Sequence, residues 1–164
     1  TADQQARDTV HQTILDIHTR TRADVETILG SLDKAVDTMF TDGEQTARKN
    51  FEDYVDRKMR EYKADRYGGL FGGAKWLKDK IFDLPDEVNE FYEKGRSDYL
   101  DAMDGVIDTI ATFVGLMLGM AKLRIEAGRA EVKTYVDGLD KSMRTLGEET
   151  AADLDNDLDR KSVV

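Results

Sequence analysis

Cysteine is absent from this chain of 164 residues, and proline occurs once. Without cysteine there is no disulfide framework, no thiolate metal site and no cysteine nucleophile. One proline, with charged residues at 35%, leaves little material for the turns of sandwiches or barrels. Hydrophobic residues at 40% are enough for a core, so we expect a soluble all-α protein.

Basic clusters are also missing, and the formal net charge is −10. Phosphate backbones repel a net anion that has no basic face, so nucleic acid is excluded as an expected partner. Signal peptides and lipidation motifs are absent as well. Because the chain begins at Thr1 without a start methionine, we expect it to be a piece of a larger protein.

The strongest pattern present is an apolar stripe whose positions are alternately three and four residues apart. Their mean spacing is about 3.6 residues, the period of a straight helix. The pattern predicts one helix, continuous from Asp86 to at least Tyr135, with the stripe running on to Leu146. The stripe comprises Val88, Tyr92, Gly95, Tyr99, Met103, Val106, Ile110, Val114, Met117, Ala121, Ile125, Gly128, Val132, Tyr135, Leu139, Met143 and Leu146.

The first part of the chain carries a second stripe with the same spacing. It predicts one helix ending near Phe40, and Thr41-Asp42-Gly43-Glu44 then predicts a turn with a capping box. A second helix, antiparallel to the first because the connection is short, should run to Gly68-Gly69. The first helix's stripe is Val10, Ile14, Ile17, Thr21, Val25, Ile28, Leu32, Val36 and Met39.

A glycine-rich hinge over residues 67–73 separates these helices from a short amphipathic helix over 74–84. Leu70 and Phe71 in the hinge, with Trp76 and nearby lysines, are candidate contacts for a membrane or a partner. The alternative is a hairpin whose apolar face completes the bundle, and this interpretation is favoured. Pro85 should then open the long helix.

Residues 106–121 form the one part of the long helix that is apolar nearly all round. Gly115 and Gly119 lie opposite the main stripe, as a small-xxx-small pair that permits close helix packing. Packing on both faces predicts that Gly119→Leu is destabilising. The alternatives are glycines tolerated on an exposed helix, or membrane insertion, which this stretch of fewer than about 20 apolar residues disfavours.

Catalytic and metal-binding patterns are not recognisable. His11 and His18 lie seven residues apart at the margin of the first stripe and are expected to be solvent-facing boundary residues, since no Glu-x-x-His motif accompanies them. No nucleophile elbow, P-loop or Ser/His/Asp set is present. We therefore expect no enzyme activity, no cofactor and no bound metal.

One run of sequence resembles a known family. It comprises Leu84-Pro85-Asp86-Glu87-Val88, Phe91-Tyr92, Gly95-Arg96, Tyr99-Leu100, Ala102-Met103-Asp104 and Gly128-Arg129-Ala130-Glu131-Val132. This run of residues resembles the helical middle region of very large bacterial proteins encoded beside extracellular contractile injection systems. Those proteins carry an amino-terminal His-Glu-x-x-His domain, absent here, and a carboxyl end that varies as a toxin. The resemblance covers residues 70–147.

The resemblance implies a non-catalytic cargo or toxin body. It would act as spacer, packaging body or translocation element, and its partners would be other domains of the parent and injection-system components. It also implies residence in the bacterial cytoplasm before export. A membrane-active module that perturbs a bilayer is the alternative.

The expected fold is an elongated antiparallel bundle of two or three long helices and one short amphipathic helix. Residues 1–147 form this single domain, and 148–164 form an acidic helical extension or tail.

Overall fold

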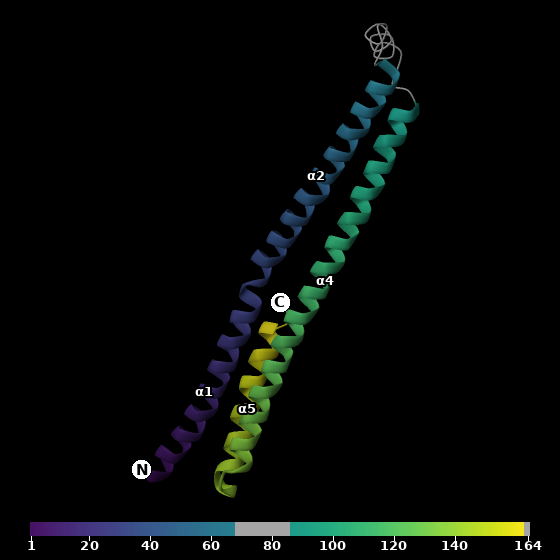
Figure 1. The fold of residues 1–164 in the computed structure, drawn as a ribbon. Coiled ribbons are helices and arrows are strands. Elements are labelled where there is room, and N and C mark those ends of the chain that lie inside the picture. Colours follow the sequence, from purple (N-terminus) through teal and green to yellow (C-terminus); the bar gives the residue numbers. More distant parts are fainter. Residues whose placement is uncertain (68–85, 163–164) are drawn as a thin grey trace. The chain divides into compact units, whose positions relative to one another are not determined.

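The computed structural model describes residues 1–67 and 86–162, which form helices and no strand. In chain order these are α1 (Ala2–Gly30), α2 (Leu32–Tyr67), α4 (Asp86–Asp137) and α5 (Lys141–Ser162) (Figure 1). The predicted all-α fold is confirmed. Contacts divide the chain into unit 1, Thr1–Lys34 with Phe113–Val164, and unit 2, Ala35–Thr112.

The long helix predicted from the main stripe is confirmed as α4, which has 52 residues. Asp86 and Glu87 lie in its first turn, where carboxylates suit the positive end of the helix dipole. Within α4, the glycines at 115 and 119 do not break the helix. The backbone hydrogen bonds of α4 therefore continue through both glycines, although each glycine lowers helix stability by about 1 kcal/mol relative to alanine.

The continuation of that stripe to Leu146 in one rod is wrong, because the chain reverses after Asp137. The amide of Gly138 donates to the carbonyls of Thr134 and Tyr135, both at 3.2 Å, and ends the helix. Asp140 then begins the next helix, since its carbonyl accepts from the amides of Met143 and Arg144. Leu139 and Met143 keep the stripe's spacing because both pack on the core after the reversal.

The predicted turn at residues 41–44 is also wrong, because these residues lie inside α2. Ser31 is the one non-helical residue between α1 and α2, and its φ of −89° and ψ of −6° are still close to helical. Gly43 serves packing: a Cβ there would lie 2.5 Å from Cγ2 of Val106. The glycine thus permits close approach of α4 and does not supply a turn.

The carboxyl-terminal segment is a packed helix. α5 spans Lys141–Ser162 and runs through the domain boundary predicted between residues 147 and 148. Leu158 is buried, and Leu154 packs on the core cluster of unit 1. Met143, Leu146 and Ala151 of α5 pack on the same cluster, so its apolar residues dock the helix despite its many carboxylates.

Unit 2 is an antiparallel pair formed by α2 and the first half of α4. The pairing is shown by edge-to-face contacts of Phe51 with Tyr99 and of Tyr62 with Phe91, whose ring centroids lie 6.5 and 6.1 Å apart. A Cβ at Gly95 would lie 2.9 Å from the ring of Phe51. Because Gly95 of α4 has no side chain, there is room at this position for the ring of Phe51 from α2.

Unit 1 brings three helices together: α1, the second half of α4, and α5. Val10 and Ile14 of α1 form a buried cluster with Val136 of α4. Thr21 is buried against Gly128, where a Cβ would lie 2.3 Å from the Thr21 hydroxyl. The contact between α5 and α4 is also close, because a Cβ on Gly147 of α5 would lie 3.2 Å from Val136 of α4.

Candidate functional site

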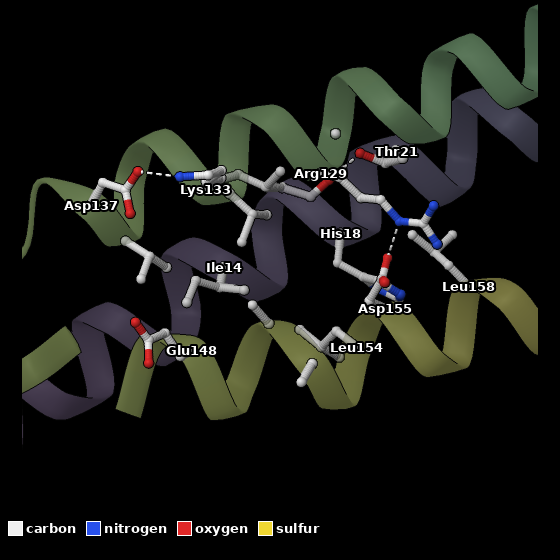
Figure 2. A pocket seen from close by; sticks show the side chains of 16 residues that line it. Ile14, His18, Thr21, Arg129, Lys133, Asp137, Glu148, Leu154, Asp155 and Leu158 are labelled. Atoms are coloured by element: carbon white, nitrogen blue, oxygen red, sulfur yellow. Dashed lines mark hydrogen bonds and ion pairs between the residues drawn. The ribbon is translucent and has the colours of Figure 1, made fainter. Parts of the chain in front are cut away.

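The candidate site is a groove in unit 1 between α1, α4 and α5, with a volume of about 440 Å³ (Figure 2). It lies where the stripes of the three helices face one another. Its lining residues are Ile14, Ile17, His18, Thr21, Gly128, Arg129, Val132, Lys133, Val136, Asp137, Glu148, Ala151, Ala152, Leu154, Asp155 and Leu158.

The floor of the groove is apolar, and its rim is charged. Figure 2 shows Ile14 from α1 and Leu154 from α5 between the helices, with Arg129, Lys133 and Asp137 along α4. The groove follows from helical periodicity, because each helix presents its apolar stripe to the other two.

His18 is a buried polar residue of this groove, with 7% of its surface exposed. Within residues 1–67 and 86–162, its Nε2 atom has no hydrogen-bond partner, and Oδ2 of Asp157 lies 3.9 Å from it. That distance is too long for a hydrogen bond. The expectation of a solvent-facing His18 is wrong because α5 packs against this side of α1; His11 is exposed as predicted.

Arg129 joins α4 to α5 through two aspartates. It donates to Asp155 through Nε and to Asp159 through Nη2, the latter at 2.6 Å. The hydrogen bond with Asp155 is the main cause that raises the pKa of the Arg129 guanidinium. The group is therefore a permanent cation whose charge is already matched at the rim of the groove.

Lys133 forms the second cationic contact of the rim, with Nζ 2.7 Å from Oδ2 of Asp137 one turn along α4. This hydrogen bond raises the pKa of Lys133. Arg20 and Arg124 make further links between α1 and α4, to Glu131 at 2.9 Å and Asp24 at 2.7 Å. Ion pairs at the surface contribute little to stability, so the role of these two pairs is to fix the register of α1 against α4.

A second surface is the outer face of α4 within unit 1. Leu116, Met120 and Leu123 are exposed on this face, with Leu116 at 65% and Leu123 at 66%. Among the described residues, no atom lies within 4 Å of a Cβ built on Gly115 or Gly119. The predicted second packing partner for these glycines is therefore not part of the described chain, and the expected loss on Gly119→Leu does not apply to the isolated protein.

Within the described ranges, α4 has the length and apolarity of a helix that can cross a membrane. An 18-residue window in it reaches a mean hydropathy of 1.6, and 6% of that window is buried. The same composition also suits a helix covered by protein, so it does not identify a membrane segment. The candidate contacts Leu70, Phe71 and Trp76, the hinge over 67–73 and the short helix over 74–84 fall on residues 68–85, outside the described ranges, apart from the helical end of α2 at Tyr67.

The described residues hold no group of three or more His, Asp or Glu side chains placed to bind a metal ion. Sequence reasoning missed His18 and Arg129 as site residues. The available signal for His18 was its place one residue after Ile17 in the α1 stripe. Three comparisons with known proteins returned nothing similar: no family model, curated protein or solved structure matches the chain.

Proposed function

We propose that this chain is a non-catalytic helical segment of a bacterial secreted toxin or contractile-injection-system cargo. It acts as a spacer or packaging body and is covered by other parts of its parent. The family resemblance over residues 70–147 supplies the biological setting. The observation that carries the proposal is the exposed apolar face of α4 at Leu116, Met120 and Leu123.

An apolar face of this kind is costly in water and stable when another surface covers it. The glycines at 115 and 119 lie on the same stretch with open space around them. Small residues let a second backbone come close, which favours a helix as the covering element. Other domains of the parent are therefore the proposed partners, and injection-system components follow from the resemblance.

The test uses the full-length parent with two lysines placed on this face, Leu116→Lys and Leu123→Lys together. We expect loading or delivery to fall while the activity of the attached toxic domain stays unchanged. Leu100→Lys is the matched control, since Leu100 is an exposed leucine of α4 in unit 2. Normal delivery by the double variant would refute the proposal.

A membrane-active module is the second candidate, favoured by the apolar window of α4. Phosphatidylcholine vesicles loaded with dye provide the test, and the single Trp76 supplies a fluorescence signal for insertion. We expect neither leakage nor a blue shift. Leakage that disappears with Leu116→Lys/Leu123→Lys, or with Phe71→Asp or Trp76→Asp, would instead establish the membrane function.

A further inference from the structure

The groove of unit 1 has room for a hydrocarbon chain and an apolar surface to hold it. Its volume of about 440 Å³ falls within the range of small-molecule sites. Val132 of α4 and Ala151 and Leu154 of α5 line the groove and are only partly buried, so a ligand can reach them. Ile17 of α1 lines it more deeply, at 4% exposed. A chain that lies along these residues is removed from water, which is favourable.

The charges that line the groove are matched except for one carboxylate. The arginine and the lysine of the lining, Arg129 and Lys133, already donate hydrogen bonds to aspartates. Glu148 also lines the groove and is exposed, and among the described residues its carboxylate has no ion pair or hydrogen bond. The groove therefore offers an unmatched negative charge to a ligand.

Glu148 lies toward the end of the groove where α4 ends. Figure 2 shows it on the same side as Asp137, the last residue of α4, with Arg129 and Leu158 toward the other side. The carboxyl end of a helix carries partial negative charge, so this end of the groove favours a cation. His18 also lines the groove, but its Nε2 atom is buried and does not meet the solvent.

We propose that this groove binds an alkylammonium ion, a hydrocarbon chain that ends in a protonated primary amine. The ammonium group donates to the carboxylate of Glu148, and the chain lies along Val132, Ala151 and Leu154. Because Glu148 is exposed, the ion pair adds modestly to affinity and the hydrocarbon contact supplies most of it. A fatty carboxylate would meet the unmatched charge of Glu148 and would find the lining cations already engaged.

The test compares decylammonium, 1-decanol and decanoate, which share a chain length and differ in the charge of the head group. Isothermal titration calorimetry measures their binding to the complete chain in about 0.15 M salt, and NMR shifts of the Val132 and Leu154 methyl groups locate the site. We expect one saturable site that binds decylammonium about three- to fivefold more tightly than decanol, and decanoate more weakly than both. Equal affinities, or binding of none, would overturn the proposal.

Butylammonium separates this site from a general attraction of cations to an acidic protein. It carries the same head group on a chain too short to cover the apolar surface, so we expect no detectable binding. Binding as tight as that of decylammonium would place the interaction on the acidic surface as a whole and overturn the proposal.

The ammonium contact has a matched pair of variants. Glu148→Gln keeps the shape of the side chain and removes its charge, so decylammonium should then bind no more tightly than decanol. Glu149→Gln is the control, because this adjacent glutamate is also exposed, does not line the groove, and changes the net charge equally. It should keep the preference. A preference that survives Glu148→Gln, or that both variants abolish, would refute the contact.

Discussion

Unit 1 and unit 2 share the helix α4 but bury their side chains differently. In unit 2, α2 and α4 pack through half-buried rings, and the buried hydrophobic residues of its described part are the separate positions Ala47, Val55 and Val88. In unit 1 the addition of α5 encloses aliphatic residues, and both hydrophobic clusters of the described chain belong there. The third helix adds to the cluster around Val10, Ile14 and Val136, whereas the cluster of Val25, Ala121 and Ile125 is formed by α1 and α4 alone.

This difference has a physical cause in the geometry of helices. When two helices pack, each covers one stripe of the other, and the residues at the margins of that stripe stay in contact with water. Aromatic side chains suit this interface because one part of the ring can be buried while another part meets water. A third helix covers those margins, and compact branched residues can then fill the interior. Ile14 at 1% exposed and Phe51 at intermediate exposure illustrate the two cases.

The largest expected effect is a cavity in the core of unit 1. Ile14→Ala should lower the free energy of unfolding by about 2–5 kcal/mol, because the site is enclosed and cannot collapse fully. Urea unfolding followed by circular dichroism measures the loss. Ile107→Ala, at a residue that is 53% exposed, is the control. A loss below about 1 kcal/mol at Ile14 would contradict an enclosed core.

A matched valine pair compares the two units with one chemical change. Val136→Ala in unit 1 and Val55→Ala in unit 2 remove the same two methyl groups, worth about 1.6 kcal/mol in transfer free energy. We expect the larger loss at Val136, because a cavity term adds where three helices enclose the site. Native-state hydrogen exchange of the neighbouring amides measures both losses, and equal values would remove the distinction between a two-helix interface and a three-helix core.

The close helix contacts should give the next largest effects. Gly128→Ala would press on Thr21 and Gly43→Ala on Val106, so each should destabilise by about 1–2 kcal/mol despite the better helix propensity of alanine. Double variants that add Thr21→Ala or Val106→Ala should show favourable coupling in a mutant cycle. A gain in stability from either single variant would show that its helices are not in close contact.

The outer face of α4 should respond in the opposite direction. Gly119→Ala should stabilise the isolated chain by about 0.5–1 kcal/mol, since the new Cβ meets no described atom and helix propensity improves. Thermal unfolding of the isolated chain provides the measurement. Gly115→Ala should behave alike. A loss of stability at either position would show that the isolated protein already covers this face, as the sequence alone had predicted.

The smallest effect concerns the exposed pair Lys133–Asp137. The hydrogen bond to Asp137 raises the pKa of Lys133, so the pair favours the folded state below the ordinary lysine value of 10.5. That contribution is lost as pH rises through the raised pKa. An NMR titration of the Lys133 Cε signal should give a midpoint that falls in Asp137→Asn. An unchanged midpoint would exclude the ion pair.

The groove shows why part of the site escaped sequence reasoning. The stripes of α1 and α4 marked Ile14, Ile17 and Val132 as packing residues, and the structure places all three in its lining. His18 sits beside the stripe, and its burial depends on α5, a segment rich in carboxylates. Leu154 and Leu158 alone were a weak sequence signal that α5 packs on the other helices. The apolar contacts of α5 with α1 and α4 nevertheless hold it in place despite its acidic composition.

Sequence determined the helical class and the extent of α4, because periodicity and proline placement act locally along the chain. It did not determine what the glycines do, since the same residue can end a helix, admit a neighbour or stand in open space. Gly138 ends α4, Gly43 and Gly128 admit neighbouring side chains, and no described atom lies within 4 Å of a Cβ built on Gly119. Only the tertiary structure decides among these roles, because each depends on which helix lies opposite.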